Sequence, residues 1–475
     1  MQAIILAVVI VIAAVGTAIY YYMTMTPQYT AETIKIGVIA NAGWPVGLSA
    51  IHAVQLAVDE INGGGGILGR NITLIVEDSK GEVPTATATY KKLVVTDGVA
   101  MVVVAEGGTV TLACMETGAE LYPEYPHLMF NAGASAEPIA TNIGKNYEKY
   151  KFTINPYTSG PDRLMSAVLM NTLLARLAGA KKIAIIGEDL VDYVPYWEGW
   201  PAYGYRPYPD YLKDAGFEVV YTSKIAVGEK NFLPIFEAIA ASGAEYIDFA
   251  MSAYSDFYTL AKQWAVSAAK DIPMFHSGVS PKYWETTGGA CLGMIGWWPS
   301  DFGAPPNPSY EVVGKTKKYI TAFYERYGYA GSNWLAEGAY DDVLFFAGIV
   351  KAVGKLDVEA LIRKAEEIEI EGVRGLMKIN PKDHTSHETY PVPAGFIEDM
   401  IKVIVEAPFN EITPRMRQVA EKYGRYPYFV YPINPVAPVA QWQKNGLLVL
   451  LYPPEVVMQS NPGKGYISPA ELRAG

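Results

Sequence analysis

Hydrophobic residues change their spacing abruptly on either side of four consecutive glycines, residues 63–66. From position 51 to 61 the apolar residues recur at intervals of three and four, which predicts one buried face of a helix. From 72 to 77 they largely alternate with polar residues, as in a strand. A glycine loop that binds phosphate follows a strand and opens a helix. Because the order here is reversed, we interpret residues 63–66 as a helix-to-strand turn.

The same exchange of strand-like and helix-like patterns continues along most of the chain. We predict strands at 34–40, 98–105, 127–133, 181–189, 217–227, 244–251, 273–278 and 291–298. Helical patterns are found at 111–122, 163–177, 208–216, 232–243, 313–327, 336–353 and 358–367. Strands that alternate with helices predict an α/β fold whose parallel sheets are covered on both faces. Because 475 residues exceed one typical core, we expect two lobes.

The pattern changes near residue 413. The Pro- and Tyr-rich stretch YGRYPYFVYPINPVAPVAQW is unsuited to a regular helix, and it precedes one apolar strand, GLLVLLY. We therefore predict an irregular C-terminal extension, 413–475, that packs along the surface.

The N-terminus carries a long apolar segment. Residues 3–23 contain no charged side chain, and these 21 residues can cross the hydrocarbon core of a bilayer as a helix. Tyr20, Tyr21 and Tyr22 suit the interface between membrane and water. A cleaved secretory signal usually has a basic start and a shorter apolar core, so we predict a retained N-terminal transmembrane helix that anchors an extracellular protein. Cleavage near Gly16 is the alternative.

Charge and cysteine content exclude several classes of protein. The net charge of −11 argues against a nucleic-acid partner, because phosphate binding needs a basic face. Cys114 and Cys291 form neither a disulfide framework nor a C-x-x-C metal or redox pair. A single bridge between them stays open.

Catalytic and metal-binding signatures are nearly absent. The chain has no G-x-S-x-G, H-E-x-x-H or Walker motif. Asp383, His384, His387 and Glu388 could converge, but we favour a solvated polar loop because no further well-spaced ligand accompanies them. We therefore expect no enzyme, no cofactor and no metal site.

Two glycine-containing segments follow predicted strands. AEGGTVT (105–111) opens a helix, and NAGAS (131–135) follows the next strand. Parallel sheets bind ligands beyond the carboxyl ends of their strands, where Gly107, Gly108 and Thr109 would offer N–H groups and a hydroxyl. A turn that merely caps the helix explains the same residues. The Tyr- and Trp-rich stretch 189–211 is likewise either an aromatic pocket wall or a loop packed on itself.

Several segments match a known family in order and spacing. IKIGVIAN, HAVQLAVDEINGGGGILGRNITLIVEDSKGEVPTATATYKKLVVTDGVAMVVV and FNAGAS contain a helix, a glycine turn, ILGR, an acidic strand end and an Ala/Thr-rich helix. KKIAIIGED, LKDAGFEVV, AEYIDFAM and EGAYDDVLFFAGIVKAVG add further matches. Together they resemble the type I periplasmic solute-binding proteins, in the branch that binds branched-chain amino acids and amides. The resemblance covers about residues 34–408.

The resemblance implies two doubly wound α/β lobes, joined by a three-strand hinge, that close on a ligand. The expected segments are the anchor and linker 1–32, lobe one at 33–154 and 300–388, lobe two at 155–299 and 389–412, and the extension 413–475.

The resemblance also implies where a ligand would bind. The family's contacts would fall on Gly108, Thr109, Thr111, Ala132, Gly133 and Ser135 in lobe one, on Tyr193 and Tyr254 in lobe two, and on Trp44 in the first loop. Where amino-acid binders carry an acidic residue for the ligand ammonium, this chain has Ser277. A buried ammonium without a counter-charge is costly, so we expect a neutral or weakly charged polar solute ahead of leucine, isoleucine or valine.

We therefore predict a membrane-tethered extracellular receptor for a small polar organic solute, which is amino-acid-, amide-, peptide- or sugar-like, and a partnership with an ABC permease. The alternative is a surface structural protein that keeps the fold and self-assembles through its N-terminal helix and C-terminal extension.

Overall fold

The computed structural model describes most of the chain after the N-terminal segment. The described residues are 33–134, 137–156, 160–201, 204–250, 256–276, 283–297, 315–329, 334–373, 375–385, 393–423, 439–452 and 466–474. The predicted anchor, 3–23, lies outside them. Within these residues no helix is both long and apolar enough to cross a bilayer.

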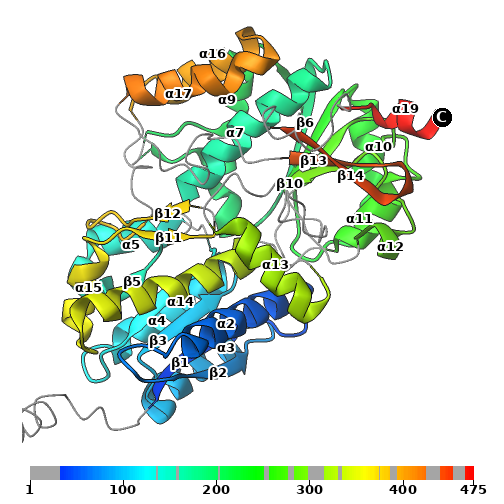
Figure 1. The fold of residues 1–475 in the computed structure, drawn as a ribbon. Helices are drawn as coiled ribbons and strands as arrows, with labels where there is room; N and C mark the ends of the chain where they lie inside the picture. The colour runs from blue at the N-terminus through cyan, green and yellow to red at the C-terminus, as the bar shows by residue number, and fades with distance from the viewer. Residues whose placement is uncertain are drawn as a thin grey trace, which may run out of the picture.

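The N-terminal lobe, lobe one, is built on a parallel sheet of five strands (Figure 1). In the order β2-β1-β3-β4-β5, its strands are β2 (Ile72–Asp78), β1 (Ile34–Ala40), β3 (Met101–Ala105), β4 (Leu128–Asn131) and β5 (Thr153–Ile154). In β1, Ile36 lies beside Leu74 of β2 and Met101 of β3. The apolar run of β1 is nearly all buried, because both faces of the sheet are covered.

Helices cover both faces of this sheet. On one face α2 (Pro45–Gly63), α13 (Thr316–Tyr327), α14 (Trp334–Val353) and α15 (Val358–Ala365) share a core with Ile34, Ile36 and Val38. On the other face α3 (Val83–Lys91), the π-helix η1 (Lys92–Asp97), α4 (Gly108–Leu121), α5 (Glu137–Lys145) and α6 (Tyr147–Tyr150) pack on Ile39, Val102 and Val104.

Lobe two repeats this arrangement. In the order β7-β6-β8-β9-β10, its parallel strands are β7 (Glu218–Ile225), β6 (Lys182–Glu188), β8 (Tyr246–Ala250), β9 (Met274–His276) and β10 (Ile295–Trp297). One face carries α7 (Gly160–Leu177), α8 (Val194–Glu198), α9 (Tyr208–Asp214), α16 (Phe396–Glu406) and α17 (Ile412–Lys422). The other carries α10 (Leu233–Ala241), α11 (Phe257–Trp264) and α12 (Tyr283–Thr287). The predicted α/β class with two parallel sheets is confirmed.

The prediction of an irregular C-terminal extension is wrong for its described residues. β13 (Val439–Gln443) and β14 (Leu447–Tyr452) form an antiparallel hairpin around the short turn η6 (Lys444–Gly446), and β13 pairs with β10. The hairpin therefore extends the sheet of lobe two, and α19 (Pro469–Ala474) follows it. Only the apolar strand at its end, β14, was predicted.

Buried contacts fix this extension. The Gln441 side chain is fully buried and donates to the carbonyl oxygens of Gly293, at 3.1 Å, and Ile467, at 2.8 Å. α17 also runs through the predicted boundary at residue 413, because Ile412 and Met416, one helical turn apart, are both buried in lobe two.

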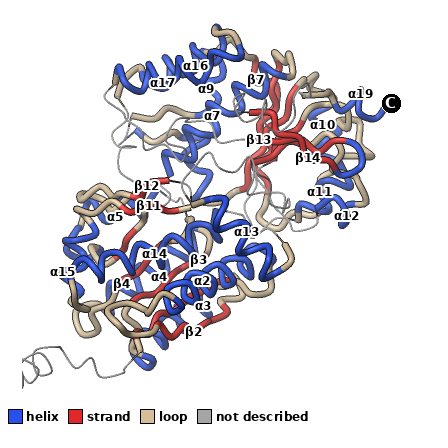
Figure 2. The backbone as a smooth tube through the Cα atoms, viewed as in Figure 1, coloured by secondary structure: helices blue, strands red, loops and turns tan. Residues whose placement is uncertain are grey.

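The chain changes lobes three times, from β5 to α7, from β10 to α13, and from β12 (Gly375–Met377), which pairs with β11 (Ile370–Gly372), to α16 (Figure 2). The Asn155 N–H donates to the His384 carbonyl oxygen at 3.0 Å, which joins the first passage to the third. The passages agree with the expected hinge, and the residue-level segment boundaries stay predictions.

The glycine run forms the predicted turn. α2 ends at Gly63, and Gly65 and Gly66 adopt φ values of 93° and 77°, in the left-handed region. A Cβ on Gly66 would lie 2.1 Å from the Arg70 carbonyl oxygen, so only glycine fits there without a backbone shift. The run therefore reverses the chain from α2 into β2.

The two cysteines do not pair. Cys114 lies in the core of lobe one and Cys291 in that of lobe two, and both are free thiols. Burial raises the pKa of each thiol to about 12, which keeps both protonated at neutral pH.

Candidate functional site

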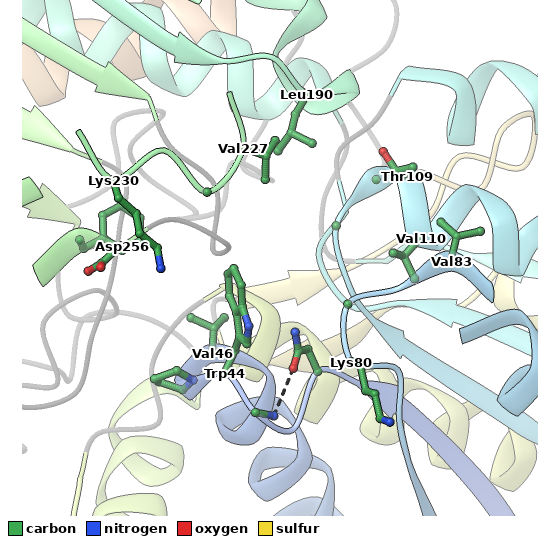
Figure 3. Close-up of a pocket in the computed structure, with 18 of the residues that line it drawn as sticks. Trp44, Val46, Lys80, Val83, Thr109, Val110, Leu190, Val227, Lys230 and Asp256 are labelled. Atoms are coloured by element: carbon green, nitrogen blue, oxygen red, sulfur yellow. Dashed lines mark hydrogen bonds between the residues drawn. The ribbon is translucent and has the colours of Figure 1, made fainter. Parts of the chain in front are cut away.

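A cavity of about 690 Å³ lies where the strand ends of the two lobes face each other (Figure 3). Its lobe-one wall follows β1, β2 and β3, and its lobe-two wall follows β6, β7 and β8. Ligands of parallel sheets bind at this edge. The lining residues are Asn41, Gly43, Trp44, Pro45, Val46, Lys80, Gly81, Val83, Gly107, Gly108, Thr109, Val110, Leu190, Val227, Gly228, Lys230, Asp256, Phe257 and Tyr258.

Trp44 is the largest lining side chain, and it stands between the two walls in Figure 3. Asn41 sets its position, because the Asn41 side-chain oxygen accepts the Gly43 N–H at 3.1 Å and its carbonyl oxygen accepts the Trp44 N–H at 3.2 Å. α2 starts at Pro45, a favourable first helical residue. The half-buried indole therefore stands on a fixed turn and offers an aromatic face to the cavity.

Most of the other lining is apolar. Valines come from both lobes, Leu190 comes from lobe two, and Phe257 and Tyr258 begin α11. An apolar wall with a few polar groups is typical of small-molecule sites.

Three charged residues complete the lining. Lys80 follows β2 and Lys230 follows β7, and both are exposed. Among the described residues neither ammonium group takes part in an ion pair. Asp256 instead caps α11, because its carboxylate accepts the Thr259 N–H at 3.0 Å and the Thr259 hydroxyl at 2.7 Å.

One hydrogen bond joins the lobes at the cavity wall. The Gly108 N–H, at the start of α4, donates to Oδ2 of Asp192 at 3.0 Å. Asp192 lies in the single 3-10 turn η2 (Val191–Tyr193), which follows β6, and it is only 7% exposed. Val191, the residue before it, packs on the lobe-one core beneath α4.

The other lobe-one residues that were predicted to contact the ligand do not all line the cavity. Thr109 is exposed and lines the cavity. Thr111 is buried, and its hydroxyl donates to the Glu106 carbonyl oxygen at 3.3 Å. Ala132 and Gly133 are buried in the loop after β4 and do not line the cavity. Ser135 lies outside the described residues, as do Tyr254 and Ser277 of lobe two.

Tyr193 points away from the cavity. It is fully buried in the core of lobe two, where its ring packs edge-on against Tyr196 at 5.4 Å, and Tyr196 packs in the same way against Tyr208. The described part of the stretch 189–211 therefore packs largely on itself. Whether a solute contacts any of the predicted residues stays a prediction.

Glu106 and His384 both have structural partners. Glu106 is buried and accepts a hydrogen bond from the Ser79 hydroxyl. The expectation of a solvated loop around His384 is wrong, since His384 is fully buried between the Thr153 carbonyl oxygen, at 2.9 Å, and a carboxylate oxygen of Glu366, at 3.0 Å. His387 and Glu388 lie outside the described residues, within which no cluster of three or more possible metal ligands occurs.

Sequence reasoning did not single out several residues of the lobe-two wall. Leu190, Val227 and Lys230 line the cavity and Asp192 contacts Gly108, although none of these residues carries a motif. The signal was their position at the end of the predicted strands 181–189 and 217–227 or within about three residues after it, which is the rule that pointed to Gly108 in lobe one.

Residues 33–392 match the periplasmic binding protein family. The chain belongs to this family. The match spans both lobes and most of the described fold, so the predicted resemblance is confirmed.

Named relatives of this periplasmic binding protein bind amino acids. It is 26% identical over 334 residues to the leucine-, isoleucine-, valine-, threonine- and alanine-binding protein of Pseudomonas aeruginosa, which covers 69% of this chain and 81% of the relative. It is 28% identical over 230 residues to the Leu/Ile/Val/Thr-binding protein of Salmonella typhimurium. That match covers 48% of this chain and only 56% of the Salmonella protein.

Solved structures support the fold. A putative branched-chain amino acid ABC transporter protein from Silicibacter pomeroyi aligns with a TM-score of 0.63 at 16% identity, covering 92% of this chain and 99% of its own. A solute-binding protein from Rhodopseudomonas palustris, in complex with 4-hydroxybenzoate, aligns with a TM-score of 0.59 at 19% identity, covering 74% and 90%. At these identities the likeness concerns the fold alone.

Proposed function

We propose that this periplasmic binding protein is the extracytoplasmic solute receptor of an ABC importer. The supporting observation is the cavity itself, because its walls come from the strand ends of both lobes. A solute held there would contact both lobes at once and so would favour the closed arrangement over an open one. The closed, loaded receptor would then deliver its solute to a permease in the membrane.

The lining supports a small organic solute with an apolar or aromatic body. Trp44 and Phe257 can pack against a ring or a branched chain, and Thr109 can accept or donate one hydrogen bond. This refines the sequence-based expectation of a polar solute, since most of the described wall is hydrophobic. The named relatives and the 4-hydroxybenzoate complex concern compounds of this size.

A binding screen tests the proposal. Melting of the full chain would be followed with leucine, isoleucine, phenylalanine, 4-hydroxybenzoate, their amides, short peptides, nucleosides and sugars. A solute at 100 times its dissociation constant stabilises the folded state by about 2.7 kcal/mol. Trp44→Ala should abolish that gain, whereas Val266→Ala, on a side chain that is 75% exposed outside the cavity, should preserve it. A gain that survives Trp44→Ala would place the binding site elsewhere.

The proposal includes the N-terminal anchor, residues 3–23, which would keep the receptor at the outer face of the membrane. Mass spectrometry of the native protein should find a chain that begins before residue 16, and a later start would contradict the anchor. The alternative of a self-assembling surface protein depends on that same segment and likewise stays a prediction.

A further inference from the structure

The hydrogen bond between Gly108 and Asp192 joins the two lobes and places a carboxylate at the start of α4. Gly108 is the first residue of α4, and the preceding Gly107 has no side chain that could cap the helix. The first N–H groups of a helix carry a partial positive charge, which favours a carboxylate at that point. Asp192 supplies that carboxylate here. It lies in the other lobe, 84 positions further along the chain.

Asp192 is held on a short, well-anchored element. The Tyr193 N–H donates to the Leu190 carbonyl oxygen at 3.0 Å, which closes the turn η2. The Tyr193 ring is fixed in the core of lobe two, while Val191 packs on the core of lobe one. The turn is therefore rooted in one lobe and inserted into the other, with Asp192 buried between them.

This placement leaves no room for a second carboxylate at the Gly108 amide. A solute carboxylate there would compete for the same N–H and would meet the Asp192 charge at close range, where like charges repel. The rest of the wall stays available, because Thr109, Trp44 and Leu190 line the cavity.

We propose that Asp192 is a built-in carboxylate that caps α4 from lobe two, holds the lobes together without a solute, and excludes a solute carboxylate from Gly108. The inference rests on the proposed function, and it names the chemistry that the receptor rejects. The recognised end of its solute is then uncharged or cationic. A carboxylate at the other end of the solute remains compatible with Lys230.

Two variants of Asp192 and one control variant test whether Asp192 holds the lobes together when no solute is bound. Small-angle scattering of the full chain should give a larger radius of gyration for Asp192→Ala than for the wild type, and a smaller increase for Asp192→Asn, which loses the charge but keeps an oxygen that can accept the Gly108 N–H. Asp189→Asn removes the same charge three residues earlier, at an exposed position, and should match the wild type. Circular dichroism would establish that each variant is folded, and Asp192→Asn, the isosteric change, covers a failure of Asp192→Ala to fold. Equal radii for all the folded proteins would overturn this half of the proposal.

Matched solute pairs test the exclusion. Calorimetry would compare leucine with leucinamide and 4-hydroxybenzoate with 4-hydroxybenzamide. For Asp192→Ala the affinity for the carboxylate relative to its amide should rise at least tenfold over the wild-type ratio, and Asp189→Asn should leave the ratio unchanged. An unchanged ratio, or no binding of either carboxylate to Asp192→Ala, would overturn the exclusion. If no solute of the broad screen binds the wild type, the proposed function fails, while the scattering result still decides the role of Asp192.

Discussion

The two lobes share a strand order and differ in what is attached to it. The order β2-β1-β3-β4-β5 in lobe one corresponds to β7-β6-β8-β9-β10 in lobe two. Lobe one ends at the two-residue strand β5, whereas lobe two continues through β13 and β14 from the C-terminal extension. The shared part follows from the repeated strand and helix pattern, and the added part comes from a segment outside that pattern. The lobes can therefore be perturbed separately.

The lobes also differ in how they bury a carboxylate. In lobe two, Asp248 accepts the Asn171 amide at 3.0 Å, and Asn171 accepts the Tyr246 hydroxyl at 2.7 Å. In lobe one, Asp342 of α14 is fully buried, and neither of its carboxylate oxygens has a hydrogen-bond partner. A buried polar group without a partner costs free energy that a bonded one largely recovers. The comparison teaches that burial alone does not set the cost of a carboxylate, because Asp248 has a hydrogen-bond donor and Asp342 has none among the described residues.

The largest effect is expected from deleting residues 439–475. The deletion removes β13 and β14, exposes the edge of β10 and takes away the buried bonds of Gln441. We expect lobe two to lose more than about 3 kcal/mol while lobe one keeps its stability. Thermal unfolding should then show a separate, earlier transition. Gln441→Ala, which leaves the strands in place, should cost about 1 to 3 kcal/mol, and a deletion variant that melts like the full chain would contradict the role of the hairpin.

Corresponding turns in the two lobes give the next largest difference. Gly66, between α2 and β2, and Gly216, between α9 and β7, both have a positive φ, at 77° and 85°. A Cβ on Gly66 would lie 2.1 Å from a backbone oxygen, whereas nothing lies within 4 Å of one on Gly216. Gly216→Ala should cost about 1 to 2 kcal/mol, from the left-handed backbone alone. Gly66→Ala should cost at least about 3 kcal/mol in urea unfolding, since its backbone must also shift. Equal costs would show that the crowding at Gly66 relaxes freely.

Because Asp342 of lobe one is buried without a hydrogen-bond partner among the described residues, we predict that Asp342→Asn raises the free energy of unfolding, and that this increase depends on pH. Burial raises the pKa of Asp342 well above its usual value, and the neighbouring Asp341 raises it further. The folded state thus keeps a proton that the unfolded chain has released, so the free energy of unfolding falls as pH rises from about 4 towards the folded pKa. Asp342→Asn should therefore stabilise the protein by about 2 kcal/mol at neutral pH and by nothing near pH 3.5.

The adjacent residue provides the control for that measurement. Asp341 accepts the Val373 N–H at 2.8 and 2.9 Å, so Asp341→Asn should destabilise at neutral pH, by about 1 to 2 kcal/mol. Chemical unfolding of both variants at several pH values would separate the two effects. An Asp342→Asn variant that gains nothing at neutral pH would mean that this carboxyl has a partner in solution.

The sequence predicted the repeated part of the fold and little of the added part. Apolar runs such as 34–40 and 98–105 reported their strands directly, because both faces of a parallel sheet are buried. Residues 439–443 escaped, since the strand VAQWQ carries two buried glutamines, and Gln441 bonds to groups far away in the sequence, at Gly293 and Ile467. Hydrophobic periodicity indicates which positions are buried. It does not indicate which distant group will form a hydrogen bond with a buried polar side chain.

The candidate site divides in the same way. Gly108 and Thr109 were found because they follow a strand and begin a helix, which are local features, and Trp44 was found through the family resemblance. Asp192 was missed because its proposed role depends on one hydrogen bond with Gly108 of the other lobe, which the local sequence does not indicate. Tyr193 was placed by family position, yet its ring is in the core.

The smallest effect is expected at the paired acid of lobe two, and it sharpens the comparison with Asp342. Burial raises the pKa of Asp248 from 3.8 to about 7, while the hydrogen bond from Asn171 opposes that rise. The wild type therefore loses stability as pH rises from about 4 to about 7, and loses no more above that. Asp248→Asn removes this loss and also gives up a charge-assisted bond, so its net gain in the free energy of unfolding at pH 8 should be about 1 kcal/mol or less.

The stabilisation by Asp248→Asn should level off near pH 7, whereas that by Asp342→Asn should continue to grow. The reason is that the pKa of Asp342 is raised well above its usual value without a hydrogen bond to oppose the rise. If unfolding of Asp248→Asn shows the wild-type pH slope between pH 4 and 7, Asp248 does not hold a proton in the folded state, and the contrast between a paired and an unpaired acid would rest on Asp342 alone.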